Sequence, residues 1–302
     1  MDTKDKILQL KKTQDIILLV HNYQLPEIQD IADIVGDSLE LSKKATELNN
    51  MNIVFCGVDF MAESAKILNP EKNIIHPDKD ARCPMAGIVD AKSLGWLIKE
   101  HPDAEVVAYI NTTAEVKALA DICCTSSNGV KVVKSCKAKK IIFVPDRNLG
   151  QYIQRFIKDK EMILWPGICS THHKITTDHI LELKKQHPKA EVLVHPECRP
   201  AVIDIADYVY STNGMINHAR KSSSTEFIIG TEKDHCYRLK TMCPMKKFFP
   251  IETAICPNMK KITLSKVLRS MKSLAPRVEL SSEILEKAYR PLKRMMDIGR
   301  GD

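Results

Sequence analysis

The chain has 302 residues, of which 44% are hydrophobic and 27% are charged, and its formal net charge is +7. This composition is typical of a globular protein with one to three domains and argues against a disordered chain. The start, MDTKDKILQLKK, is too charged for a signal peptide, and no apolar run reaches the roughly 18 residues of a membrane span. We therefore expect a soluble, cytoplasmic protein with no membrane partner.

The positive charge is concentrated in the C-terminal quarter, where residues 231–302 contain 16 Lys and Arg against 8 Asp and Glu. These basic residues alternate with apolar ones, as on the exposed face of a helix, and only 5% of the chain is aromatic. Nucleic-acid binding is therefore not expected. A small, negatively charged substrate is a simpler partner for this charge.

The elements predicted along the chain repeat three times. The runs DIILLVHNY, EVVAYIN and EVLVHPE predict buried strands, and His21, Tyr109 and His195 lie near their ends at steps of 88 and 86 residues. Each run is followed by an Ala-Asp pair, a serine and a stretch that predicts a helix. The three serines are Ser38, Ser126 and Ser211.

Each repeat continues with a second predicted strand and closes on a cysteine. The second strands are NIVFCGV, KIIFVPD and EFIIGTE, and the cysteines are Cys83, Cys169 and Cys256, at steps of 86 and 87 residues. Alternating strands and helices predict an α/β fold of three homologous units with parallel sheets. Loops at the carboxyl ends of the strands would then meet around a pseudo-threefold axis.

We expect the units to span residues 1–85, 86–171 and 172–260. The remaining residues, 261–302, predict C-terminal helices, the second of them capped by Ser282, that pack outside the units and on the first one.

The three equally spaced cysteines are the candidate metal ligands. The stretch WPGICSTHH alone suggests a local site of Cys169, His172 and His173, but the repeat assigns Cys169 to a set with Cys83 and Cys256. Three converging thiolates suit an iron–sulfur cluster with one open iron, or zinc with His172 added. As single residues, they could also be ordinary buried cysteines.

The other cysteines have weaker claims to metal binding. No C-x-x-C pair occurs, Cys198 in HPECRP is the best substitute ligand, and Cys243 precedes Cys256 by 13 residues. The rest are expected to pack in the interior or line the site: Cys56, Cys123, Cys124, Cys136 and Cys236.

Five ordered blocks, from about residue 17 to 265, resemble the quinolinate synthase family: HNYQLPEIQDIADIVGDSLELS, FCGVDFMAESAKILNP, YINTTAEVKALADICCTSSN, VHPECRPAVIDIADYVYST and CPNMKKITL. The resemblance implies that iminoaspartate, supplied by L-aspartate oxidase, condenses with dihydroxyacetone phosphate to give quinolinate, phosphate and water in de novo NAD synthesis. It also implies three αβα-sandwich units around a pseudo-threefold axis. Finally, it implies a 4Fe–4S cluster on Cys83, Cys169 and Cys256. The stretch AICPNMK lacks the extra cysteines of some members, so redox control through them is not expected.

The resemblance also implies roles for residues around the cluster. Glu197 is the first choice for general base, with His195 beside it, and Tyr23, Tyr109 and His172 are candidates for proton transfer. Lys221 is expected to help close the site over the phosphate. The residues expected to contact substrate are His21, Ser38, Tyr109, Asn111, Ser126, His195, Glu197, Ser211 and Thr212.

Two other classes remain open. The diphthamide-synthesis radical enzymes have a similar three-unit architecture, but the blocks HNYQ and GDSLELS argue against them. The non-enzyme alternative is a zinc-dependent nucleic-acid-binding protein.

Overall fold

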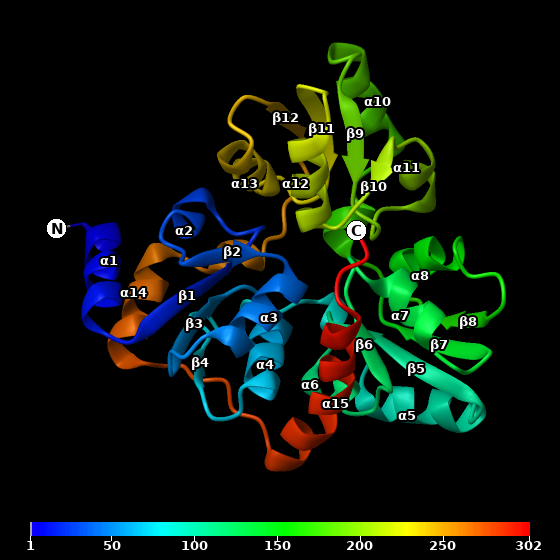
Figure 1. The fold of residues 1–302 in the computed structure, drawn as a ribbon, viewed down its shortest axis with the longest axis horizontal. Coiled ribbons are helices and arrows are strands. Elements are labelled where there is room, and N and C mark those ends of the chain that lie inside the picture. The colour runs from blue at the N-terminus through cyan, green and yellow to red at the C-terminus, as the bar shows by residue number, and fades with distance from the viewer. Residues whose placement is uncertain (1) are drawn as a thin grey trace.

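Three separate parallel sheets form the framework of the computed structural model, which describes residues 2–302. Each sheet has four strands, in the orders β2-β1-β3-β4, β6-β5-β7-β8 and β10-β9-β11-β12. The three sheets with their helices lie as lobes around a common centre (Figure 1). This confirms the predicted α/β class with three similar αβα units.

The strands are short, and each is paired only with strands of its own sheet. The first sheet contains β1 (Ile16–His21), β2 (Ile34–Gly36), β3 (Asn52–Cys56) and β4 (Asn73–Ile75). The second contains β5 (Ala104–Tyr109), β6 (Ile122–Cys124), β7 (Lys140–Val144) and β8 (Glu161–Leu164). The third contains β9 (Glu191–Val194), β10 (Tyr208–Val209), β11 (Glu226–Gly230) and β12 (Lys247–Pro250).

The helices connect the strands and cover the sheets. Those of the first unit are α1 (Thr3–Thr13), α2 (Pro26–Gln29), α3 (Ser38–Glu47) and α4 (Asp59–Leu68). The second has α5 (Ala91–Glu100), α6 (Ala114–Lys117), α7 (Gly129–Ser135) and α8 (Arg147–Gln154), and the short α9 (Ser170–His173) follows β8. The third has α10 (Thr177–Gln186), α11 (Pro200–Asp204), α12 (Thr212–Lys221) and α13 (His235–Met242), before α14 (Leu264–Ser273) and α15 (Ser282–Ile298).

The Ala-Asp repeat has a structural cause. In each unit the aspartate accepts a hydrogen bond from a backbone N–H of the first strand, at 2.8 Å in all three cases. The pairs are Leu18–Asp33, Val106–Asp121 and Val192–Asp207. Each aspartate directly precedes the short second strand of its unit. Its side chain thus satisfies a backbone N–H of the neighbouring central strand.

A second repeat was not predicted. Lys72, Lys160 and Lys246 each donate from Nζ to two backbone carbonyls in the last turn of a helix or just beyond it. In each unit this is the helix between the second and third strands, namely α3, α7 and α12. For Lys160 the acceptors are Cys136, at 2.7 Å, and Ala138, at 3.1 Å. A cation at this position compensates the unpaired carbonyls and the negative end of the helix dipole.

Half of the strands were also not predicted. The sequence pattern predicts two strands in each unit, and the structure adds two more. The added strands are very short: β2, β6 and β10 span two or three residues, and β4, β8 and β12 span three or four. Such lengths are too short to produce a readable alternation of polar and apolar residues.

The two C-terminal helices occupy different places. Helix α14 packs against α1 and β3, while α15 contacts α4 of the first unit and α6 and β6 of the second. The predicted cap Ser282 is wrong, because Ser281 Oγ accepts from the backbone N of Ile284 at 3.3 Å. The unit boundaries at residues 85 and 171 stay predictions.

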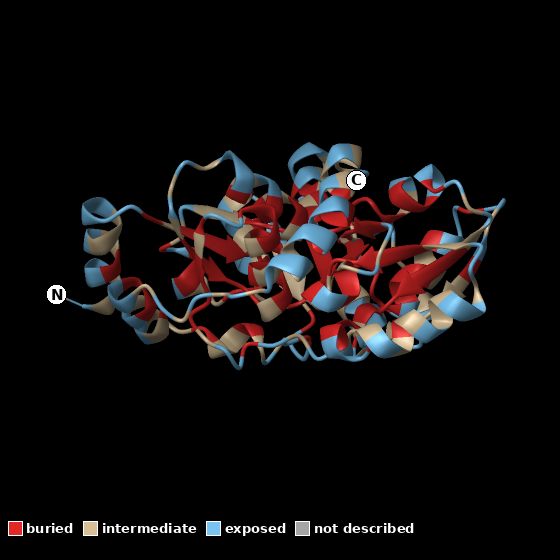
Figure 2. Ribbon diagram, turned by 90° about the horizontal axis from the view of Figure 1, so that it is seen from below, coloured by how far each residue is buried: buried red, intermediate tan, exposed pale blue. Residues whose placement is uncertain are grey.

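The edge-on view shows a flattened molecule whose strands are buried and whose outer helices carry the exposed residues (Figure 2). One continuous apolar core joins the first two units through α15, whereas the third unit has its own clusters. Within residues 2–302, no helix combines the length and the apolar character that crossing a lipid bilayer requires.

Candidate active site

A pocket lies where the three units meet, at the carboxyl ends of their first strands. His21 is the last residue of β1, Tyr109 is the last residue of β5, and His195 directly follows β9. All three side chains line the pocket, and each is no more than 4% exposed. The strand-end residues that the repeat singled out are therefore brought together.

The residues at the helix starts that face the pocket match the predicted serine repeat only in part. Ser38 and Thr212 are the first residues of α3 and α12, Ser126 lies in the turn before α7, and all three line the pocket. Ser211, expected to contact substrate, does not line it. Instead its Oγ accepts from the backbone N of Gly214 at 3.2 Å and caps α12. Thr212 is thus the structural counterpart of Ser38.

Lys221 lies far from these helix starts. It is the last residue of α12, whereas Thr212 is the first. At 1.5 Å of rise per residue, the two are roughly 14 Å apart along the helix axis. Lys221 does not line the pocket, and its expected role in closing the site stays a prediction.

The three-cysteine set, Cys83, Cys169 and Cys256, lines the same pocket. The backbone N of each cysteine donates to a buried or half-buried carboxylate that follows the third strand of its unit, at 2.9, 3.0 and 3.3 Å. The carboxylates belong to Asp59, Asp146 and Glu232, which are 87 and 86 residues apart. Sequence reasoning missed them, although GVDF, VPDR and GTEK carry the same period as the cysteines.

The donor chemistry of this set fits a cationic metal cluster. Burial raises the pKa of the Cys83 thiol to about 12, and it also raises the pKa values of Cys169 and Cys256. The charge of Cys256 further raises the pKa of Cys83, and that of Cys83 raises the pKa of Cys169, which indicates close neighbours. Three buried thiolates would require nearby positive charge, which a metal cluster held by them would supply.

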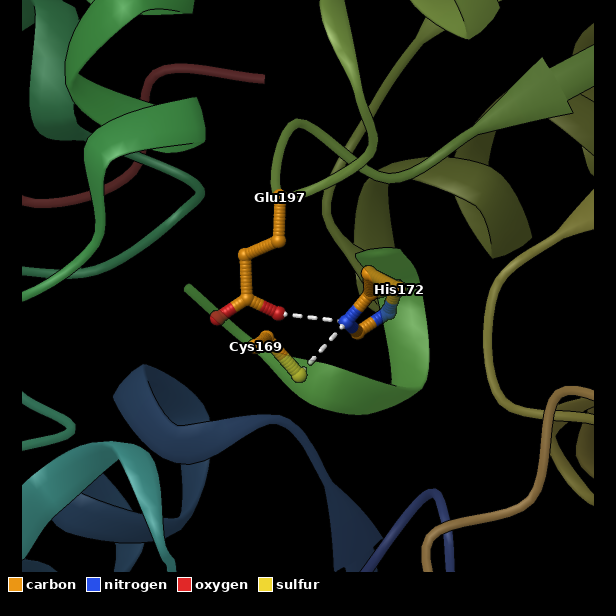
Figure 3. A group of neighbouring side chains, drawn as sticks. All are labelled: Cys169, His172 and Glu197. Atoms are coloured by element: carbon orange, nitrogen blue, oxygen red, sulfur yellow. Dashed lines mark hydrogen bonds and ion pairs between the residues drawn. The ribbon is translucent and has the colours of Figure 1, made fainter. Parts of the chain in front are cut away.

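Beside this set, His172 joins a cysteine to a carboxylate (Figure 3). His172 Nδ1 lies 2.7 Å from Glu197 Oε2 and 3.2 Å from Cys169 Sγ. These three donor atoms lie within 4.8 Å of one another, so they could also hold a single metal ion. The site is thus compatible with either of two metal centres that would use Cys169. One is a cluster on the three cysteines, and the other is a single ion on Cys169, His172 and Glu197.

Glu197 is held as a carboxylate between two histidines. Burial opposes its ionisation, but the charges and hydrogen bonds of His172 and His195 outweigh burial and hold the pKa of Glu197 below its ordinary value. His195 Nδ1 is 3.3 Å from Glu197 Oε2, and the two imidazole rings stack with centroids 4.5 Å apart. Glu197 Oε1 has no hydrogen-bond partner among the described residues, which leaves one buried oxygen for a ligand.

Neutral groups form the rest of the polar lining. Burial lowers the pKa of His21 to about 3 and also lowers the pKa of His195, while it raises the pKa values of Tyr23 and Tyr109. At neutral pH His21 is therefore uncharged and the two phenols are protonated. Asn111 completes the predicted contacts and also lines the pocket.

The remaining cysteines are not part of the lining. Cys198, the best substitute ligand by sequence, is fully buried, and its Sγ lies 3.4 Å from the carbonyl oxygen of Gly230. Cys243 is buried at the end of α13. Neither is among the residues that line the pocket.

Comparison with known proteins gives one consistent result. Residues 5–297 match the family model described as Quinolinate synthetase A protein. The chain is 50% identical over 297 residues to the quinolinate synthase of Thermodesulfovibrio yellowstonii, covering 98% of both chains. It is 50% identical over 294 residues to that of Methanoregula boonei, with 97% of both covered, and 47% identical to that of Caldicellulosiruptor bescii, with 98% of both covered.

Proposed function

The chain belongs to the quinolinate synthase family, and from this membership we propose that it condenses iminoaspartate with dihydroxyacetone phosphate. The products are quinolinate, phosphate and two molecules of water, and the reaction serves de novo NAD biosynthesis in the cytoplasm. L-aspartate oxidase would supply the unstable imine. The observation that carries the proposal is that all the predicted site residues except Ser211 line one buried pocket.

The three-cysteine set would hold a 4Fe–4S cluster. Three cysteines leave one of four irons without a protein ligand, and that iron supplies Lewis-acid chemistry toward a substrate oxygen or nitrogen when the cluster is bound. The carboxylates of Asp59, Asp146 and Glu232 fix the three cysteine loops through the backbone, so the thiols are held in place by separate units.

Both substrates are anions, and the pocket offers neutral and positive partners for them. The first residues of α3 and α12, Ser38 and Thr212, present hydroxyls and helix N-termini to the pocket, where carboxylates and phosphates bind favourably. Ser126, Asn111 and the neutral His21 add hydrogen-bond donors. The substrate carboxylates would therefore lie at this side of the pocket.

The reaction also requires several proton transfers. Glu197 is an ionised carboxylate with one free oxygen, so it can accept a proton from carbon or nitrogen of the substrate. Tyr23 and Tyr109 remain protonated and can donate to a leaving oxygen. His172 and His195 hold the Glu197 carboxylate in position.

Anaerobic turnover of iminoaspartate and dihydroxyacetone phosphate, with quinolinate as the measured product, tests the reaction. The purified protein should be brown and contain about four irons per chain. Cys169→Ala should lose the visible absorption and quinolinate formation together, while Cys236→Ala, a matched change on α13, should keep both.

Two results would overturn the proposal. A Cys169→Ala protein with a complete cluster spectrum would remove the cluster assignment. One zinc per chain without iron would favour the single-ion site of Cys169, His172 and Glu197 and the hypothesis of a zinc protein.

A further inference from the structure

Lys117 is a fully buried lysine near the pocket that the proposed chemistry does not use. It is the last residue of α6, and its Nζ donates to the backbone carbonyl of Thr112. The ammonium also lies over the ring of Phe60 in the first unit, 5.5 Å from the ring centre. Phe60 lines the pocket, and so do Tyr109 and Asn111 on the loop that Thr112 ends. Lys117 therefore joins this loop of the second unit to the start of α4.

A carboxylate of the first unit crosses the same boundary in the other direction. Glu63, one turn after Phe60 on α4, accepts at 3.0 Å from the backbone N of Ala114, the first residue of α6. Burial lowers the pKa of Lys117, and the charge of Glu63 opposes this effect. Burial raises the pKa of Glu63, and the charge of Lys117 opposes it in turn. Each group thus favours the ionised form of the other.

The threefold repeat supplies two other versions of this boundary. Lys117 lies three positions before an Ala-Asp pair, and the residues at that place in the other units are Gln29 and Ile203. Gln29 Nε2 donates to the carbonyl of Gln24, five residues earlier, at 2.8 Å, and to that of Asp234 in the third unit at 3.2 Å. An uncharged amide at this place can therefore hold the loop of its own unit and reach the next unit.

The corresponding residue on the opposite helix changes together with this position. Helix α6 contacts α4 of the first unit, α2 contacts α13 of the third, and α11 contacts α8 of the second. On each opposite helix, the corresponding residue lies four positions after the carboxylate that binds a cysteine loop. The pairs are Lys117 with Glu63, Gln29 with Cys236, and Ile203 with Gly150. Only the pair that contains the lysine also contains an acid.

We propose that Lys117 is a positioning residue that holds the loop of Tyr109 and Asn111 in place through the Thr112 carbonyl, while Glu63 balances its buried charge. This inference rests on the proposed function for its effect on turnover, whereas the coupling of the two charges stands on the geometry alone. Lys117 acts through the loop, because its own side chain does not line the pocket.

The test compares Lys117→Gln with Lys117→Met, each combined with Glu63→Gln. Glutamine keeps a donor for the Thr112 carbonyl, and methionine has a similar length without a donor. The change at Glu63 removes the opposite charge but keeps an oxygen for the backbone N of Ala114. The two double variants therefore differ in the hydrogen bond to the loop and not in charge.

In turnover of iminoaspartate and dihydroxyacetone phosphate, kcat/KM of the methionine variant should fall about fivefold or more, the effect of one typical hydrogen bond. The glutamine variant should stay within about twofold of Glu63→Gln, and both should retain the cluster absorption. Lys99→Met, an exposed change on α5 of the same unit, is the matched control and should have no effect. Equal kcat/KM values in the two double variants, or a greater loss with glutamine, would overturn the inference.

Thermal midpoints test the charge pair without turnover. Lys117→Met alone leaves the Glu63 carboxylate without its balancing charge, so it should lower the midpoint by roughly 4 °C or more. Adding Glu63→Gln should restore part of this loss, although Glu63→Gln alone should lower the midpoint of the unchanged protein. Additive losses would overturn the inference whatever the activity. Coupled losses in a protein that forms no quinolinate would support the charge pair and refute the proposed reaction.

Discussion

At the scale of single residues, the site depends on pairs that neutralise or orient one another. Glu197 would be costly as an isolated buried charge, but His172 and His195 hold it ionised at 2.7 and 3.3 Å. Its Oε1 is unpaired among residues 2–302, which is unusual for a fully enclosed oxygen. This oxygen is therefore available to a ligand in the pocket, in line with the proposed role of Glu197.

Glu197→Gln should lower kcat for quinolinate formation about 100-fold or more, because the amide has nearly the same size but cannot accept a proton. Iron content and cluster absorption should not change, since Glu197 is not one of the three cysteines. Glu182→Gln, on the exposed face of α10, is the matched control. Steady-state kinetics check this prediction, and a kcat within a factor of two of the unchanged protein would exclude Glu197 as the base.

The residues that sequence reasoning found and those that it missed differ in their chemistry. Cys83, Cys169 and Cys256 are rare in type and equally spaced, so the repeat exposes them. Asp59 and Asp146 have the same spacing, but aspartate is a common residue type, and only the fold shows that these two bind the cysteine loops.

At the scale of elements, each unit is built from two central strands of four to six residues and two outer strands of two to four residues. The apolar runs of β1, β5 and β9 predicted the central strands, because parallel strands are buried on both faces. The outer strands carry too few residues for a pattern, and they are defined by pairing with the centre. The sequence therefore predicted the order and type of the central elements. The edge strands can be identified only from their tertiary contacts.

The contacts that join the start of β9 to α12 and the loop after it predict a pH dependence of stability. Glu191, at the start of β9, accepts from Ser222 and Ser224 at 3.0 and 2.6 Å and binds His218 Nε2 at 2.7 Å. Burial opposes ionisation, but these hydrogen bonds and the His218 charge hold the pKa of Glu191 below its ordinary value of 4.5. A lowered pKa means that the carboxylate stabilises the fold above about pH 4.5 and loses this effect as pH falls through the folded value.

Glu191→Gln should therefore lower the thermal midpoint at pH 7 by about 2 °C, as expected for roughly 1 kcal/mol in a chain of this size. The difference from the unchanged protein should shrink steadily below pH 4.5. Circular dichroism melts at several pH values measure it, with Glu182→Gln as the control for charge. A difference that stays constant with pH would show that the Glu191 charge does not contribute.

At the scale of the whole molecule, the three units are held together unequally. The first two share one apolar core with α15, whereas the third unit has its own clusters. The pocket nevertheless needs residues from all three, such as His21, Tyr109 and His195. Polar contacts across the centre must therefore help to hold the third unit in register.

The last residues of the chain provide such contacts. The Nη2 of Arg300 lies 2.6 Å from Asp37 Oδ2 in the first unit, and its Nη1 lies 3.1 Å from Ser211 Oγ in the third. The backbone N of Gly301 donates to the carbonyl of Ser127 in the second unit at 2.8 Å. Asp37, Ser127 and Ser211 adjoin the pocket residues Ser38, Ser126 and Thr212, so this segment connects the three helix-start loops.

Arg300→Ala should therefore loosen the anion-binding side of the pocket without affecting the cysteines. Losing about 1 kcal/mol of bridging hydrogen bonds would weaken the ordering of the three helix-start loops about fivefold as an equilibrium constant, so KM for both substrates should rise by up to about that factor. The thermal midpoint should fall slightly, and the cluster absorption should stay the same. Arg290→Ala, an exposed arginine on α15, is the matched control. If Arg300→Ala lowers kcat with KM unchanged, or if both variants behave alike, the bridge does not govern substrate binding, and the third unit is held by its packing alone.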